Sequence, residues 1–277
     1  MLHLAARALG LALLAGHSGI AATQSGNNVA FLDAIAKSDG RAVAAIRKTA
    51  AGGDLLSAKV LAGILIRGSD VPQDLAQGRS WAKQVAAVGD ADGQLLLYLA
   101  TILDPAVARA EEVFAYENLA RAAAQGHVPA LAALVEFYSD KLGPENQNRA
   151  EQLLSLHPEL PDPGNYRHWL ALVRHWGTTR ATPELLRDSM RAAMATAVAS
   201  AGQRACKDIK PQKLAIASEV RSAAYLPLEH PALHETYLTG GNWTEHWTFS
   251  VCGTETTVEA TFSIDAHSGA NYVFKAL

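Results

Sequence analysis

The sequence predicts an α+β protein, in which an N-terminal α-solenoid of helix-turn-helix repeats precedes a small antiparallel β-sheet domain. Two observations predict this fold class. A glycine doublet recurs at intervals of 36 and then 37 residues: Gly53-Asp54, Gly89-Asp90 and Gly126-His127. A fixed period of this length is typical of stacked helix pairs. From about residue 213, apolar residues instead recur at every second position, which is typical of β-strands.

The composition is that of a folded protein with an ordinary core. Of the 277 residues, 49% are hydrophobic and 18% are charged, and the formal net charge is -3. Because the basic residues are scattered, nothing predicts a phosphate-binding surface, and we expect no nucleic acid partner.

The first 22 residues have the composition of a secretory signal peptide. Residues 1–7 contain no acid, residues 8–15 form an apolar run too short to span a bilayer, and residues 19–22 offer small side chains for cleavage. An amphipathic first helix is the alternative. A cleaved signal predicts a periplasmic or secreted bacterial protein, and we expect no membrane span after its removal.

Each repeat is expected to begin with a helix that carries small residues on one face. These helices start near Ala58, Gly93 and Ala130. Offsets 0, +4, +5 and +8 from these residues fall on one helical face, where small side chains let neighbouring helices approach closely. In the first repeat, the second helix is expected to begin after the N-cap Asp74 and to end at Gly89.

The first repeat also carries a known pattern. Its residues are Ala58, Ala62, Gly63, Gly68, Val71, Gln73, Asp74, Gly78, Trp81, Ala82, Lys83, Val85, Ala86, Gly89 and Asp90. This pattern resembles the Sel-like repeat, a relative of the tetratricopeptide repeat. The resemblance covers residues 29–157 and is best over 54–90, while residues 104–110 lack the usual glycine loop and Asn118 stands at the tryptophan position. It implies a solenoid that acts as a scaffold for a protein or peptide partner.

Large side chains occupy the opposite face of the predicted first helices. We expect this row, at offsets +2, +6 and +9, to be exposed and to bind a partner. The alternative is that the chain's own C-terminal half, or a second copy, covers it. The candidate partner-binding residues are Val60, Ile64, Arg67, Leu95, Leu99, Ile102 and Glu136.

Residues 158–205 are expected to form a linker and two connecting or capping helices. Prolines and a glycine in residues 158–164 stop the helical period. Helical spacing returns over residues 166–176 and 183–201, and Thr182 is a suitable N-cap for the second of these helices.

Residues 206–277 are expected to form the antiparallel β domain. Strands are predicted over residues 214–220, 243–252, 256–264 and 272–274. The pattern W-x-E-x-W-x4-C-G, which begins at Trp243, resembles a small C-terminal module of some exported bacterial proteins, and this resemblance implies no activity.

The two cysteines, Cys206 and Cys252, are expected to form a disulfide if the protein is exported, because an even count in an oxidising compartment favours pairing. Such a bond would join the preceding helix to the sheet. Two unpaired buried thiols are the alternative.

The sequence lacks the motifs of common catalytic and metal sites. It contains no G-x-S-x-G, Walker loop or H-E-x-x-H, and Pro231 argues against a helix that would bring His230 and His234 together on one face. We therefore expect no catalytic residue, no metal and no cofactor. The expected function is an exported, periplasmic protein-binding scaffold that is not an enzyme, with self-association open. One alternative is a periplasmic immunity or inhibitor protein that neutralises a secreted toxic effector. The other is a cell-wall or lactam-acting hydrolase, for which the sequence offers least.

Overall fold

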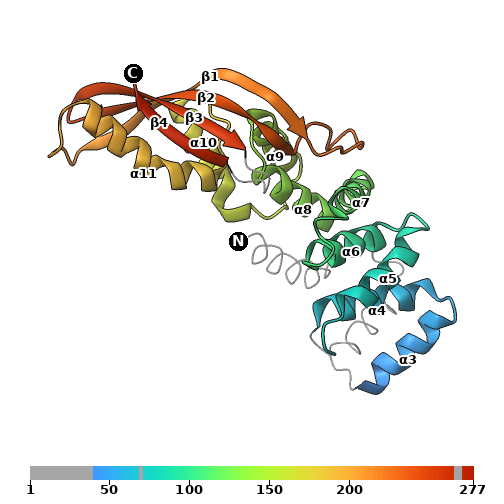
Figure 1. The fold of residues 1–277 in the computed structure, drawn as a ribbon. Coiled ribbons are helices and arrows are strands. Elements are labelled where there is room, and N and C mark those ends of the chain that lie inside the picture. Colours follow the sequence, from blue (N-terminus) through green and yellow to red (C-terminus); the bar gives the residue numbers. More distant parts are fainter. Residues whose placement is uncertain (1–39, 69–70, 265–269) are drawn as a thin grey trace. The chain divides into compact units, whose positions relative to one another are not determined.

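The computed structural model describes residues 40–68, 71–264 and 270–277, and its fold is α+β as predicted (Figure 1). Helices α3 to α11 come first, and an antiparallel sheet of strands β1 to β4 follows. The chain divides into two compact units between Ala133 and Leu134. The predicted signal peptide, residues 1–22, lies outside the described residues.

The N-terminal unit is built from antiparallel helix pairs. Its helices are α3 (Gly40–Ala51), α4 (Leu55–Arg67), α5 (Leu75–Ala86), α6 (Ala91–Ile102), α7 (Glu112–Ala124) and the start of α8 (Val128–Ser139). From α3 to α7 each helix packs on the next, and α4 also contacts α6. The arrangement of these helices is solenoid-like.

The recurring glycines end one helical segment and let the chain turn into the next. Gly53, Gly89 and Gly126 have φ values of 94°, 84° and 73°. Residues with a Cβ atom rarely adopt such angles, whereas glycine does so without strain. The glycine of each doublet is therefore required by the backbone.

The residue after each glycine caps the following helix. Its side chain accepts a hydrogen bond from the backbone N–H three residues later: Asp54 from Ser57 at 2.8 Å, Asp90 from Gly93 at 2.9 Å, and His127 from Ala130 at 3.3 Å. Each bond satisfies one of the N–H groups that a helix start leaves without a partner. The repeat period of the sequence thus reflects the regular recurrence of a glycine turn followed by a helix N-cap.

The C-terminal unit contains the rest of α8 and four further helical segments. These are α9 (Pro144–Leu156), the short 3-10 helix η1 (Pro163–Asn165), α10 (Tyr166–Trp176) and α11 (Pro183–Ser200). Thr182 caps α11 as predicted, accepting from the backbone N–H of Leu185 at 3.2 Å. Among the described residues, no helix combines the length and the apolar character needed to cross a bilayer.

The sheet is a four-stranded antiparallel meander. Its strands are β1 (Ile209–Tyr225), β2 (Leu238–Val251), β3 (Thr254–Ile264) and β4 (Ala270–Ala276), in that spatial order. The first strand is longer than the predicted 214–220, because several register shifts let it follow β2 for most of its length. In Figure 1, α10 and α11 lie along one face of the sheet, and α11 packs against β2, β3 and β4.

Aromatic side chains from β2, β3 and β4 fill the space between the sheet and α11. Trp243 stacks on Phe262 with ring centroids 4.9 Å apart, and Trp247 lies 5.3 Å from Phe274. Both tryptophans are fully buried, as is Phe249. Because alternate residues of β2 point into this core, the period-2 pattern of the sequence reports the buried face of the sheet.

The predicted disulfide between Cys206 and Cys252 is present, and it links the segment after α11 to the end of β2. The paired residues are separated by 46 positions, so the bond closes a sizeable loop in the unfolded chain. Pairing also leaves no described cysteine free.

We expect a Cys206→Ala/Cys252→Ala variant to unfold with a free energy lower by about 2–4 kcal/mol, because the open chain gains conformational entropy. Urea denaturation followed by near-UV circular dichroism measures this. The wild type in reducing agent should match the variant; equal midpoints for the oxidised wild type and the variant would contradict the expectation.

Candidate functional site

The row of candidate partner-binding residues is mostly buried. Ile64, Leu95 and Leu99 are only 1%, 5% and 2% exposed, while Val60 and Ile102 are half-buried. This corrects the expectation that the row faces solvent. The three buried side chains can reach a partner only if the helices separate.

The burial follows from how many neighbours a repeat helix has. Helix α4 packs against α3, α5 and α6, so little of its circumference remains open. Ile64 accordingly belongs to a cluster that includes Val43 of α3 and Val85 of α5. This face of the helix carries large aliphatic residues because it is a second packing surface.

The two charged residues of the set lie in different units. Arg67, at the end of α4, is half-buried, and its Nε atom has no hydrogen-bond partner. Glu136, on the part of α8 that belongs to the C-terminal unit, is also half-buried. Burial, reinforced by the negative charge of Asp140 one turn later, raises the pKa of Glu136 to about 7.

This raised pKa predicts a pH-dependent stability. The folded state holds the Glu136 proton more tightly than the unfolded chain, whose pKa is near 4.5. The carboxyl therefore destabilises the fold as the pH rises from about 4.5 to about 7, and has no such effect below that window. We expect Glu136→Gln to stabilise the protein by on the order of 1 kcal/mol at pH 8, after allowing for solvent screening, and to change little at pH 4.

Urea midpoints of the wild type and of Glu136→Gln at the two pH values test this. Glu255→Gln is the matched control, since Glu255 is exposed on β3. A gain for Glu136→Gln that is equal at both pH values would show that the effect does not come from the proton.

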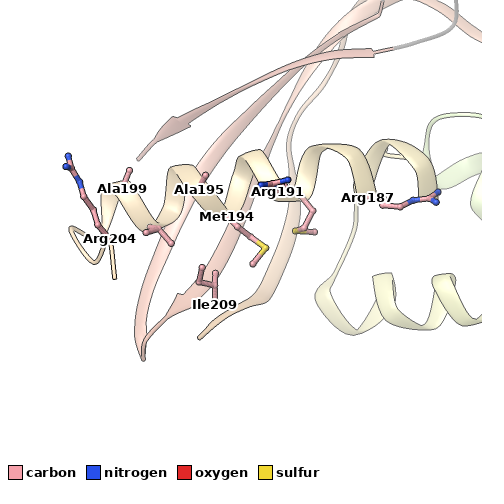
Figure 2. A pocket seen from close by; sticks show the side chains of 9 residues that line it. Arg187, Arg191, Met194, Ala195, Ala199, Arg204 and Ile209 are labelled. Carbon is pink, nitrogen blue, oxygen red and sulfur yellow. The ribbon is translucent and has the colours of Figure 1, made fainter. Parts of the chain in front are cut away.

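A groove beside α11 is the candidate binding site of the C-terminal unit (Figure 2). It has a volume of about 630 Å³ and is open to solvent rather than enclosed. Its lining residues are Arg187, Met190, Arg191, Met194, Ala195, Val198, Ala199, Arg204 and Ile209. All but the last two come from one stripe of α11, because positions three and four residues apart share a helical face.

The groove exists because α11 is packed through the neighbouring face. Ala193 and Ala197 are fully buried against the sheet, and their small side chains let the helix approach it closely. Met194 and Val198 follow one position later, so they pack against the edge of the core and remain half-buried. Ile209, at the start of β1, completes this apolar floor.

The rim of the groove is positively charged. Arg187, Arg191 and Arg204 are exposed, and no ion pair joins any of them to a residue that the structure describes. Figure 2 shows Arg187 and Arg204 towards opposite ends of α11, with Arg191 between them. Although the whole chain has a net charge of -3, every charged residue that lines the groove is an arginine.

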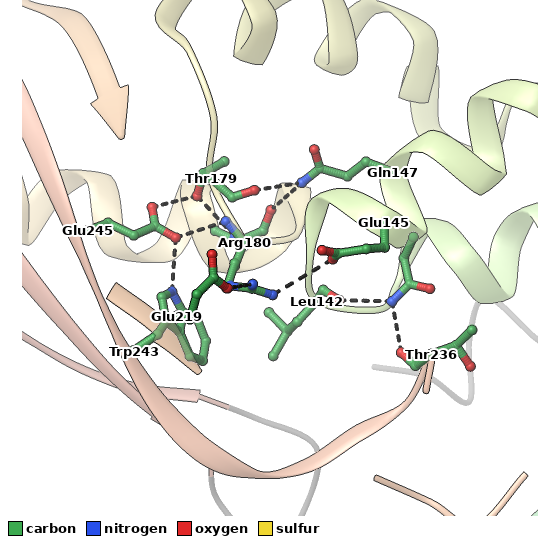
Figure 3. A network of polar contacts seen from close by, with 11 residues as sticks. Leu142, Glu145, Gln147, Thr179, Arg180, Glu219, Thr236, Trp243 and Glu245 are labelled. Carbon is green, nitrogen blue, oxygen red and sulfur yellow. Dashed lines mark hydrogen bonds and ion pairs between the residues drawn. The ribbon is translucent and has the colours of Figure 1, made fainter. Parts of the chain in front are cut away.

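A second polar feature is centred on Glu245, which is fully buried (Figure 3). Its Oε1 accepts hydrogen bonds from the backbone N–H of Arg180 at 2.8 Å and from the indole of Trp243 at 2.9 Å. Its Oε2 accepts from the hydroxyl of Thr179 at 2.7 Å and from the indole of Trp247 at 2.9 Å. Four donors thus replace the water that a buried carboxylate loses.

This arrangement explains the W-x-E-x-W pattern. Residues two apart on a strand lie on the same face, so the two indoles flank the carboxylate. The donors from Thr179 and Arg180 then join the segment between α10 and α11 to the centre of the sheet. Because Glu245 has no exposed surface, it cannot meet a substrate, and its role is to hold this segment in place.

The side chain of Arg180 lies at the edge of the same network. Its guanidinium pairs with Glu219 of β1 and lies 3.7 Å from the carboxylate of Glu145 on α9. Its carbonyl accepts from the backbone N–H of Gly143 at 2.9 Å. The segment between α10 and α11 is therefore connected to β1, β2 and the start of α9.

Within residues 40–68, 71–264 and 270–277, no three histidine, cysteine, aspartate or glutamate side chains are grouped in a way that could hold a metal ion. His230 and His234 lie in the turn before β2, where the Nδ1 atom of His230 accepts from the backbone N–H of Ala232 at 3.2 Å.

The comparisons with known proteins identify no relative. No family model matches the chain, and neither a curated protein nor a solved structure does so.

Proposed function

We propose that the protein is an exported, periplasmic protein-binding scaffold whose partner contacts the groove beside α11. The observation that carries this proposal is an apolar floor bounded by arginines that have no ion-pair partner among the described residues. Methionine and arginine are both enriched at protein interfaces, where an apolar centre is surrounded by a polar rim. The groove has this composition on a single helix.

Two features support export. The disulfide between Cys206 and Cys252 suits an oxidising compartment, since cytosolic reductants keep most thiols reduced. The composition of residues 1–22, with an apolar run followed by small residues, suits a signal that is cleaved during export.

The N-terminal unit is the weaker candidate for the contact. Its large exposed apolar residues include Leu55, Leu56, Val88 and Phe114. Single exposed residues of this kind are common on any protein surface. The unit's solenoid-like stack therefore supports a scaffold role without supplying the contact surface, and the groove is the site to test first.

The proposal is tested by site-specific cross-linking in cells that export the protein. A photo-reactive amino acid placed at Ala195, which is exposed in the groove, should capture one partner. The same amino acid at Val273, which is 69% exposed on β4, is the control and should not capture it.

The captured protein is then purified and its affinity for groove variants is measured. Met194→Asp places a charge in the apolar floor, and we expect it to weaken binding by at least about ten-fold. Arg191 is exposed, so Arg191→Glu leaves the core unchanged, and we expect this variant to weaken binding as well. Unchanged affinity in both variants, with circular dichroism showing intact folds, would exclude the groove.

The partner's identity also separates a scaffold from an inhibitor. If the protein is an inhibitor, titration with it lowers the catalytic activity of the purified partner in a stoichiometric way. A scaffold binds its partner and leaves that activity intact.

A further inference from the structure

We infer that the segment bound in the groove is an acidic amphipathic helix. This inference rests on the proposed function, because it specifies the kind of partner segment that a protein-binding groove beside α11 would accept.

The shape of the groove suits a helix. The lining residues of α11 run from Arg187 to Ala199, which corresponds to about 18 Å along the helix axis. A partner helix of about three to four turns would match this length and place apolar side chains at i, i+3 or i+4, and i+7 along the floor. Because the groove is open rather than enclosed, its occupant must shield the floor from water, and a helix does so with its own backbone groups already hydrogen-bonded.

The side chains of the floor can change conformation to fit the partner that packs on them. Met190 and Met194 are unbranched and half-buried, so they can change rotamer to follow the surface of an incoming helix. Val198 and Ile209 extend the same apolar strip towards the end of the groove. The floor therefore selects apolar character more strongly than one particular side chain.

The positive charges of the rim favour a bound segment with negative charge. Arg187 and Arg191 lie one helical turn apart, and Arg204 lies beyond the end of α11. Glutamates or aspartates flanking the apolar strip of the bound helix would pair with these guanidinium groups and would speed association. A basic or uncharged helix would gain no such pairing, so the groove discriminates against it.

The first test uses synthetic peptides and the full-length, disulfide-bonded protein. The probe is a fluorescent helical peptide of about 16 residues with leucines on one face and flanking glutamates. One control peptide has the same composition with leucines distributed around the helix, and the other has lysines in place of the glutamates. At low salt, we expect the probe to bind at least about ten-fold more tightly than either control, as measured by fluorescence anisotropy.

The second test exchanges the charges. Arg187→Glu/Arg191→Glu should weaken binding of the acidic probe by at least about ten-fold and should strengthen binding of the lysine peptide. Arg221→Glu is the matched control, because Arg221 is exposed on β1 and does not line the groove, and it should leave both affinities unchanged. Since all three arginines are exposed, these variants remain informative even where Met194→Asp fails to fold.

Three results would overturn the inference. One is equal affinity for the acidic and the lysine peptides. Another is binding to vesicles that contain phosphatidylglycerol, abolished by the same arginine variants, which would identify an anionic lipid surface as the occupant. The third is a dimer dispersed by Met194→Asp in sedimentation, which would identify a second copy of the chain.

The failure of the inference is distinguishable from failure of the proposed function. If the acidic peptide does not bind, while a purified partner still loses affinity with Met194→Asp, the groove binds protein but not this class of helix. If neither the peptide nor the partner responds to the groove variants, the proposed function itself is wrong.

Discussion

Glu245→Ala is expected to lower the free energy of unfolding by about 3–5 kcal/mol. The substitution leaves four donors without an acceptor, from the side chains of Thr179, Trp243 and Trp247 and from the backbone of Arg180. All four lie at or near the buried core, where water cannot replace the carboxylate.

Glu245→Gln is expected to fall between the wild type and Glu245→Ala. An amide keeps one acceptor oxygen and places an NH₂ group at the other position. The NH₂ group is best tolerated at the Oε2 position, because the hydroxyl of Thr179 can rotate to accept, whereas the indole of Trp247 then faces another donor. We therefore expect a loss of about 2 kcal/mol.

Chemical denaturation followed by tryptophan fluorescence measures both variants, and Glu255→Ala serves as an exposed control on β3. The expected order of stability is wild type, Glu245→Gln and then Glu245→Ala. A Glu245→Gln variant as stable as the wild type would show that the buried carboxylate does not anchor the segment between α10 and α11.

Gly177→Ala is expected to be nearly as damaging, with a loss of about 3–5 kcal/mol from a steric clash and backbone strain. Gly177 ends α10 with a φ of 129°, an angle that residues with a Cβ atom rarely adopt. An added Cβ would lie 2.3 Å from the carbonyl oxygen of Leu214, which accepts a hydrogen bond from the backbone N–H of Thr178 at 3.0 Å. Because that oxygen belongs to β1, relief of the clash would move the segment away from the sheet.

Gly202→Ala is the matched control. Gly202 also has a positive φ, of 68°, but an added Cβ there meets no atom within 4 Å. We expect this variant to lose only about 1 kcal/mol, from backbone strain alone. Equal losses for the two variants would show that the approach of Gly177 to β1 is not important for stability.

The parts of the fold that follow from local rules were predictable from the sequence. In the doublet Gly89-Asp90, the glycine indicates the end of one helix and the aspartate the start of the next. Both signals depend on local backbone geometry and involve few distant residues. The same holds for Thr182 at the start of α11 and for the alternating residues of β2. The pairing of Cys206 with Cys252 was predictable because only two cysteines are present.

What depends on packing between elements was not predictable in this way. Periodicity shows that Ile64 and Leu99 lie away from the small-residue face, but not that other helices cover them. The role of Glu245 was equally hidden, because half of its donors come from a segment more than 60 positions away in the sequence.

The groove left a signal in the sequence that helical periodicity could have found. Met190, Met194 and Val198 recur every four residues, and Arg187 and Arg191 flank them with the same spacing. This stripe is adjacent to the face of Ala193 and Ala197, which packs on the sheet. A helix that is apolar over more than its packing face is a candidate for a second contact.

The reciprocal charge exchange is the most direct test of the central claim, that the groove beside α11 binds an acidic amphipathic helix. The measurement is the affinity of the wild type and of Arg187→Glu/Arg191→Glu for the acidic and the lysine peptides. The variant is expected to bind the acidic peptide at least about ten-fold more weakly than the wild type does, and to bind the lysine peptide more tightly. A variant that binds both peptides as the wild type does would contradict it.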